Sequence, residues 1–349
     1  MRFDRSVDSR FVPLVMVAAA AAAFGCKRFS AEDSPIQEAA AASAPTTQPD
    51  PACAGRKDGD GLCDGKILRV CEQGKPRTVA TCWSIEKCDA ASRSCLPDCP
   101  AGEVYIPATG PGGFTMGRGR QGQRDKPHKV VLTRPFCLDE TEVTAGAYGA
   151  CVEEGKCAEP YKWDPYSTWP RFPDQPINMV NWFKAKAYCE HVGKTLPTEA
   201  QWEWAATGGD GREWPWGDEK PTCFNGLADF TPGGAPKSTP GGDVGCHGGG
   251  PSAVKAHPRG AKEWPGGKLY DLAGNVWEWT LDYAMPYPAS PQQDPVVSEV
   301  PGKPDMTVRS IRGGGWNRSD IGITTWFRGE ATERYQVPGL GFRCARPAQ

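Results

Sequence analysis

The chain has 349 residues, of which 42 are glycine, 34 are proline and 10% are aromatic, so it is rich in turns yet has enough large side chains for a core. The formal net charge of -2 excludes a nucleic-acid-binding surface that relies on excess basic charge. Fifteen cysteines favour an oxidising compartment, because structural disulfides are reduced in the cytosol. We therefore expect an exported, loop-rich protein with short elements of secondary structure.

The first 26 residues have the pattern of an export signal that ends in a lipidation site. Three arginines precede an alanine-rich apolar run at 11–24, which is shorter than the roughly 20 residues needed to span a bilayer. A small residue precedes Cys26, so we expect cleavage and acylation there; an ordinary cleaved signal is the alternative. The prediction is a lipoprotein of the bacterial cell envelope. The outer membrane is favoured, because Lys27 gives no retention signal.

Two segments of different composition follow. Residues 27–51 are rich in Ala, Ser, Pro and Thr without a hydrophobic period, which predicts a flexible linker. Residues 52–99 hold seven cysteines and few large apolar residues, so this mini-domain needs disulfides for stability. The absence of a CxxC pair and of histidine argues against zinc. Because seven is odd, we expect three internal bridges and pairing of Cys99 with Cys137.

The region from residue 100 onward predicts short strands and helices. Strands are predicted at 104–107, 113–117 and 129–132. Helices are predicted at 145–154, 182–192 and 198–206, with Thr144, Asn181 and Thr198 as the residues that can cap their first turns. After Thr207 no long regular element is predicted, since loops rich in glycine and proline dominate to the C-terminus.

An ordered series of motifs covers about residues 100–346. They are GGFTMG (112–117), DETEVT (139–144), PINMVNW (176–182), AKAYCEHVGKTLPTEAQWEWAA (185–206), WPWGD (214–218), LYDLAGNVWEWT (269–280), RSIRGGGW (309–316) and GLGFRCAR (339–346). In this order they resemble the formylglycine-generating enzyme family, also called sulfatase-modifying factors. The resemblance implies an α+β, loop-rich fold related to C-type lectins over residues 100–348. Active members of the family use copper and oxygen to oxidise a sulfatase cysteine to formylglycine.

The copper site is where this sequence departs from the family. Family members hold Cu(I) between two cysteines that follow a GGSW-like motif. Aligned on the Gly-Gly pair, these positions are Arg318 and Ile323, and no cysteine lies between Cys246 and Cys344. Neither side chain offers a lone pair, whereas Cu(I) prefers soft thiolates, so copper and a catalytic residue are not expected here. Gly315 also replaces a serine of active members.

Calcium is the metal that the resemblance favours, with a structural role at two sites built from hard oxygen ligands. The first set combines two carboxylates with the carbonyls of a tight glycine turn: Asp271, Gly274, Val276 and Glu278. The second set is Asn225, Gly226, Asp243 and Gly245. The alternative is that the acidic side chains only cap turns.

The remaining cysteines allow three further bridges. The resemblance implies Cys189–Cys344, which closes a loop of about 156 residues and constrains the unfolded chain by about 5 kcal/mol on the loop-entropy model. Parity suggests Cys151–Cys157, a loop of about seven residues contributing nearer 2 kcal/mol, and Cys223–Cys246. Connectivity is not deducible from the sequence, so these pairs are hypotheses.

The cleft around the former copper site is the expected ligand site. Its predicted lining is Trp316, Arg318, Trp326 and Arg328, and Arg318 can pair with a carboxylate or phosphate. We favour a non-catalytic binding or structural module for a protein, peptide or glycan ligand. One alternative is an oxidoreductase of the formylglycine-generating type, or another oxidase on the same scaffold. Another is an accessory role in which residues 52–99 contact the partner.

Overall fold

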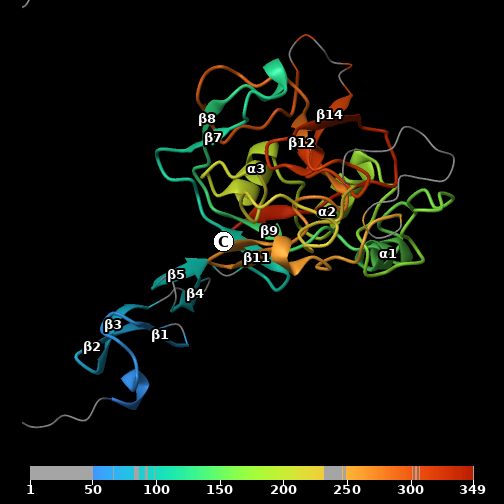
Figure 1. Cartoon of the computed structure of the whole chain (residues 1–349). Helices are drawn as coiled ribbons and strands as arrows, with labels where there is room; N and C mark the ends of the chain where they lie inside the picture. Colours follow the sequence, from blue (N-terminus) through green and yellow to red (C-terminus); the bar gives the residue numbers. More distant parts are fainter. Residues whose placement is uncertain are drawn as a thin grey trace, which may run out of the picture. The chain divides into compact units, whose positions relative to one another are not determined.

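The computed structural model describes residues 50–65, 67–81, 86–90, 93–97, 99–231, 246, 249–300, 302, 305 and 307–348. The predicted signal segment with Cys26, and Asp243 and Gly245 of the second calcium set, lie outside these residues. The described part of the chain is α+β, with many short strands and three α-helices (Figure 1). None of its helices has the length and apolar character needed to cross a membrane.

The cysteine-rich segment folds as a small sheet followed by a hairpin. The antiparallel sheet contains β1 (Gly61–Asp64), β2 (Ile67–Glu72) and β3 (Lys75–Thr81), and the hairpin pairs β4 (Glu86–Asp89) with β5 (Ser94–Pro97). The disulfides Cys53–Cys71 and Cys63–Cys88 cross-link this segment. The expected third internal bridge falls on Cys82 and on the side chain of Cys95, which are outside the described part.

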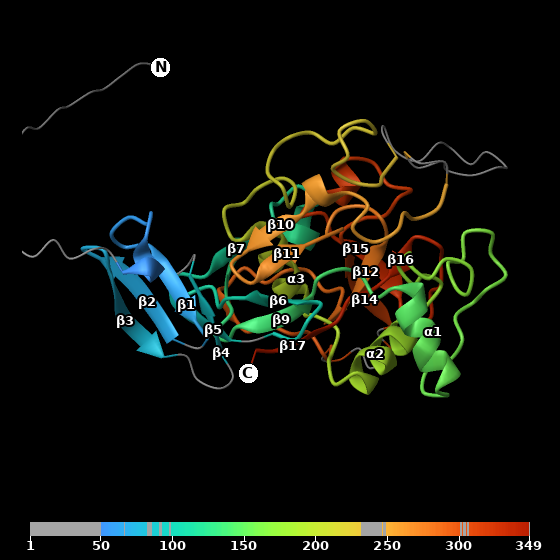
Figure 2. The same ribbon diagram turned by 90° about the horizontal axis from the view of Figure 1, so that it is seen from below.

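Two small sheets join segments of the main domain that are far apart in sequence, and the first brings its two ends together. One has the order β17-β9-β6, formed by β17 (Ala345–Pro347), β9 (Phe136–Asp139) and β6 (Glu103–Ile106). The other has the order β13-β8-β7, formed by β13 (Gln292–Gln293), β8 (His128–Val131) and β7 (Phe114–Met116). Figure 2 shows β6, β9 and β17 side by side. The predicted strands near 104, 113 and 129 are therefore present.

The prediction that no long regular element follows Thr207 was wrong. A four-stranded sheet has the order β15-β14-β12-β16: β15 (Gly329–Thr332), β14 (Val308–Arg312), β12 (Trp277–Tyr283) and β16 (Leu340–Gly341). A hairpin of β10 (Lys262–Trp264) and β11 (Gly267–Leu269) precedes it. The first four residues of β12 are all buried, so this strand lacks the alternation of apolar and polar residues that reveals a half-exposed strand.

The three helices begin at the predicted caps. They are α1 (Ala145–Glu153), α2 (Trp182–His191) and α3 (Glu199–Thr207). Thr144 and Asn181 accept hydrogen bonds from the first turns of α1 and α2, and Thr198 forms a capping box with Gln201. Helices α1 and α2 pack with β12 in one apolar cluster, and α3 packs against β6–β9 in another. Four tryptophans of α3 and β12 are buried in these clusters: Trp202, Trp204, Trp277 and Trp279.

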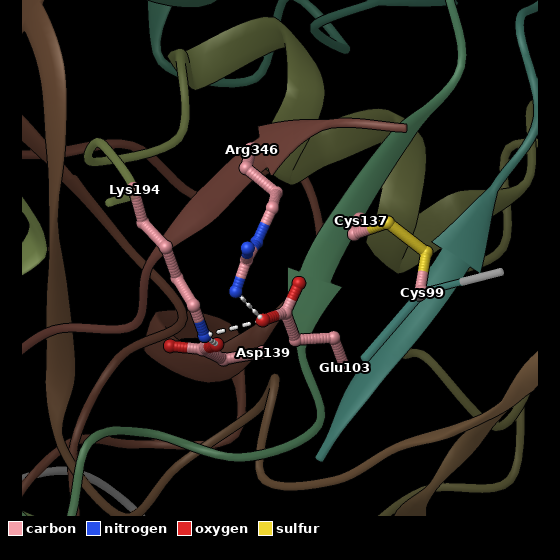
Figure 3. Close-up of a disulfide and its surroundings, with 6 residues drawn as sticks. All are labelled: Cys99, Glu103, Cys137, Asp139, Lys194 and Arg346. Carbon is pink, nitrogen blue, oxygen red and sulfur yellow. Dashed lines mark hydrogen bonds and ion pairs between the residues drawn. A yellow bond between two sulfur atoms is a disulfide. The ribbon is translucent and has the colours of Figure 1, made fainter. Parts of the chain in front are cut away.

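Disulfides and ion pairs fix the start of the main domain to its last strand. Cys99–Cys137 joins the chain before β6 to β9, as expected (Figure 3). Beside this disulfide, Glu103 accepts from Lys194 at 2.8 Å and from Arg346. The three other expected disulfides are also present: Cys151–Cys157, Cys189–Cys344 and Cys223–Cys246.

Candidate functional site

The loop after β14 carries Arg318 and Ile323, the two positions that the sequence motifs aligned with the family's copper cysteines. Gly314 adopts a φ of 73°, in the left-handed region that favours glycine. A Cβ at this position would lie 2.4 Å from the carbonyl oxygen of Gly322. Glycine therefore allows this loop to pack closely against the 3₁₀ turn Ile321–Ile323.

Arg318 and Ile323 have different environments. Ile323 is fully buried, in an apolar cluster that includes Trp214 and Phe230. Arg318 is exposed, and its guanidinium carbon lies 5.8 Å from the centre of the Trp277 ring. It forms no ion pair with the described residues. The pair thus combines a core side chain with a cation at the surface, and neither side chain is a ligand for copper.

Several buried hydrogen-bond donors lie close to Arg318. Trp277 Nε1, Trp316 Nε1 and Asn275 Nδ2 have no hydrogen-bond partner among the described residues. The backbone N–H of Trp316 donates to the carbonyl of Asn275 at 2.8 Å, and a Cβ at Gly315 would lie 3.4 Å from Trp277 Cδ1. A buried donor without a partner costs about 1–3 kcal/mol, so oxygen atoms of water or a ligand would stabilise this cluster.

Arg328 and Trp326, which the sequence analysis placed in the ligand cleft with Arg318, are both held by internal hydrogen bonds. Arg328 is buried and donates two hydrogen bonds to Glu199, at 2.6 and 2.7 Å. Burial alone would raise the pKa of Glu199, but Arg328 and Arg312 lower it. Trp326 is also buried and donates through Nε1 to Glu213 at 3.1 Å. Both side chains belong to internal networks.

Two acidic residues of α3 that the sequence analysis did not single out organise this internal network. Glu199 and Glu203 lie one helical turn apart and pair with Arg312 at 3.1 and 2.7 Å. Burial raises the pKa of Glu203 to about 7 and that of the neighbouring Asp282 to about 6. The signal for this network was the pair of acids among the apolar residues of TEAQWEWAA. A cavity of about 130 Å³ adjoins Glu199, Asp282 and Arg328.

The first predicted calcium set lies in a buried acidic region. Asp271 accepts from the backbone N–H of Lys255 at 2.7 Å, and both oxygens of Glu278 accept from Arg343 at 2.8 Å. Glu142 is also buried there, with both carboxylate oxygens lacking a hydrogen-bond partner. Burial raises the pKa of Asp271 to about 6.

The chemistry of this region suits a hard cation. Burial raises the pKa of Glu142 well above its usual value, the nearby carboxylates of Asp271 and Glu278 raise it further, and Arg343 forms an ion pair with Glu278. Gly274, with a φ of 86°, forms the tight turn between Asp271 and Glu278. Within the described ranges, however, no three or more His, Cys, Asp or Glu side chains are grouped closely enough to hold a metal. Backbone carbonyls, including those of Gly274 and Val276, would have to complete any calcium site.

The second predicted calcium set is only partly described. Asn225 accepts from the N–H of Thr222 and donates to the carbonyl of Lys220, both at 3.0 Å, and its neighbour Gly226 has a φ of 64°. These contacts form a local turn next to the Cys223–Cys246 disulfide. Because Asp243 and Gly245 lie outside the described residues, the second site stays a prediction.

Comparison with known proteins gives consistent similarities. Residues 98–348 match the family model of the sulfatase-modifying factor enzyme 1-like domain. The formylglycine-generating enzyme of Streptomyces coelicolor is 29% identical over 302 residues, covering 72% of this chain and 91% of that protein. The inactive C-alpha-formylglycine-generating enzyme 2 of Mus musculus is 32% identical over 294 residues, covering 70% of this chain and 85% of that protein.

Other similarities are more limited. The hercynine oxygenase of Mycolicibacterium thermoresistibile is 28% identical over 228 residues. This match covers 55% of this chain and 46% of the oxygenase. Among solved structures, PvdO from Pseudomonas aeruginosa has a TM-score of 0.52 at 24% identity, covering 70% of this chain and 94% of that chain. Treponema denticola variable protein 1 has the same TM-score at 23% identity and the same coverage. These two structures support the fold.

Proposed function

Because this chain belongs to the sulfatase-modifying factor enzyme 1-like domain family, we propose that it is a non-catalytic binding module on that family's scaffold. The observation that carries the proposal is the exposed Arg318 and the buried Ile323, the residues that the motif alignment assigns to the positions of the copper cysteines. A guanidinium cannot donate a lone pair to Cu(I), and a fully buried isoleucine has no donor atom. The cysteines of the described disulfides are likewise not free thiolates.

The proposed ligand presents an acidic, oxygen-rich group to the surface near Arg318. The guanidinium has no ion-pair partner in the described part of the chain, and the indole N–H groups of Trp277 and Trp316 lack acceptors there. A carboxylate would accept charge-assisted hydrogen bonds from Arg318, and a small shift of this exposed side chain would give it access to the indole N–H groups. The ligand would thus provide partners that the protein itself does not supply.

Calcium and membrane attachment complete the proposal. Asp271 and Glu278, together with the carbonyls of Gly274 and Val276, would hold calcium, whose chemistry here is to neutralise buried carboxylates. Acylation of Cys26 would hold the protein at a bacterial cell envelope, with 27–51 as the tether.

Copper binding tests the non-catalytic part of the proposal. Cu(I) titrated into the purified chain with intact disulfides should show no tight stoichiometric site. The double variant Arg318→Cys/Ile323→Cys is the matched comparison, because it restores two thiols at the same positions. Tight binding by the unaltered chain would favour the alternative, an oxidase like those named among its relatives.

A pair of small probes tests the binding part. N-acetylglycine carries a carboxylate, and N-acetylglycinamide has the same shape without the charge. The indole N–H signals of Trp277 and Trp316 should shift in nuclear magnetic resonance spectra with the acid and much less with the amide. Arg318→Gln should abolish the difference. Equal responses to both probes in the unaltered chain would contradict an acid-specific cleft.

A further inference from the structure

A second surface feature lies away from the Arg318 loop in sequence. A shallow depression of about 270 Å³ forms where residues 159–163, after α1, meet α2 and the segment before β16. Two aromatic residues, Tyr161 and Trp163, line it, and the other lining residues are polar or charged apart from one proline. Neither the sequence motifs nor the proposed anion cleft accounts for this feature.

The two aromatic side chains are unusually accessible. Trp163 is 79% exposed and Tyr161 is 49% exposed, although large aromatic side chains normally bury most of their surface. The indole N–H of Trp163 and the phenol of Tyr161 form no hydrogen bond with the described residues. Both residues therefore offer an apolar ring face and a free polar group to a ligand.

Hydrogen bonds from two side chains to backbone carbonyls hold in place the loop that carries these rings. Arg171 Nη2 donates to the carbonyls of Pro165 and Ser167 at 2.8 and 2.7 Å. Ser167 Oγ in turn donates to the carbonyl of Tyr161 at 3.1 Å. A preorganised loop loses little conformational entropy when it binds a ligand, so these exposed rings are suited to recognition.

The rim of the depression supplies polar groups in fixed positions. Lys184 Nζ donates to the carbonyl of Glu159 at 2.7 Å and to Gln336 Oε1 at 3.0 Å, while the amide NH₂ of Gln336 donates to none of the described residues. Lys162 pairs with one carboxylate oxygen of Glu159 at 2.8 Å. Donors and acceptors therefore surround the aromatic rings, whereas aliphatic side chains do not line the depression.

This combination identifies the chemical class of the ligand. A pyranose ring has an apolar face of C–H groups and an edge of hydroxyls, which match an exposed aromatic ring and a polar rim. A groove for an aliphatic peptide anchor would instead need aliphatic walls. We propose that the depression binds a saccharide, with one sugar ring stacked on Trp163 and hydroxyl groups bonded to Glu159, Lys184 and Gln336.

The test uses three hexasaccharides, cellohexaose, maltohexaose and chitohexaose, each titrated into the full chain by calorimetry. At least one should bind, and Trp163→Ala should weaken that binding by about tenfold or more, as expected for a central aromatic contact. Phe224→Ala is the matched control, because Phe224 is 99% exposed and lies outside the depression. It should leave the affinity unchanged, and circular dichroism should show that both variants fold.

Three results would overturn the proposal. They are failure of all three sugars to bind, retention of full affinity by Trp163→Ala, and Trp163-dependent binding of a proline-rich peptide without binding of any sugar. Arg318→Ala should leave sugar affinity unchanged, so failure of this proposal and failure of the anion cleft give different results.

Discussion

Three arginines near the C-terminal end of the main domain lie in two different environments. Arg328 and Arg312 are buried and share the carboxylate of Glu199, whereas Arg318 is exposed and has no ion pair within the described part. Buried arginines lose hydration and depend on their partners, so they fix the structure and leave little capacity for a ligand. Arginines that are close in sequence can therefore have different roles: the buried ones stabilise the fold, and the exposed one is available to bind a ligand.

The largest expected effect on stability comes from removing a buried arginine. Arg328→Ala should lower the free energy of unfolding by about 3–5 kcal/mol, because it leaves Glu199 buried without its main partner. Urea denaturation with the disulfides intact measures this loss. A loss below 1 kcal/mol, about the value of an exposed pair, would show that Arg328 does not stabilise the core.

Buried Asp282 allows a second test of the internal network, through the pH dependence of the unfolding free energy. Burial raises its pKa from 3.8 to about 6, so the folded state binds this proton more tightly than the unfolded state does. The contribution of Asp282 to stability is therefore most favourable at acidic pH and becomes less favourable as pH rises, by about 3 kcal/mol in total between about pH 4 and pH 7. Asp282→Asn should flatten the pH dependence of the unfolding free energy across this interval. An unchanged slope would contradict the assignment.

Calcium extends the comparison to a third buried arginine, Arg343, which pairs with Glu278. Calcium at a hundredfold excess over its dissociation constant should stabilise the folded chain by about 2.7 kcal/mol. Asp271→Asn should remove most of this gain, and magnesium should not replace calcium, because its smaller shell demands stricter geometry. Thermal unfolding with and without chelator measures the effect. Equal calcium stabilisation of the Asp271 variant would place the ion elsewhere.

The smallest expected effect on stability belongs to Arg318. Because its side chain is exposed and unpaired among the described residues, Arg318→Ala should change the unfolding free energy by less than about 0.5 kcal/mol. The same variant should lose its preference for N-acetylglycine over the amide. If Arg318→Ala destabilised the fold as much as Arg328→Ala, the division between structural and binding arginines would fail.

Local signals in the sequence were sufficient for the helices. Thr144, Asn181 and Thr198 cap them within the first turn, and such contacts span only a few residues. Strand β12 was missed because both of its faces are buried at its start, which removes the alternation that reveals half-exposed strands. Periodicity alone therefore could not identify it.

The candidate site was only partly predictable for a related reason. Residue type alone excluded Arg318 and Ile323 as copper ligands, whatever their position in space. The role of Arg328 depends on Glu199, which lies 129 residues away in sequence. The sequence therefore could not distinguish a paired arginine from a free one, and it assigned both Arg318 and Arg328 to the cleft.

Aerobic oxidation of a cysteine-containing sulfatase peptide tests the central claim most directly. The purified full chain, supplied with copper, should neither consume oxygen above background nor convert the peptide cysteine to formylglycine. The Streptomyces coelicolor formylglycine-generating enzyme, assayed in parallel, is the positive control. Copper-dependent conversion by this chain would contradict a binding module that lacks the thiolate pair.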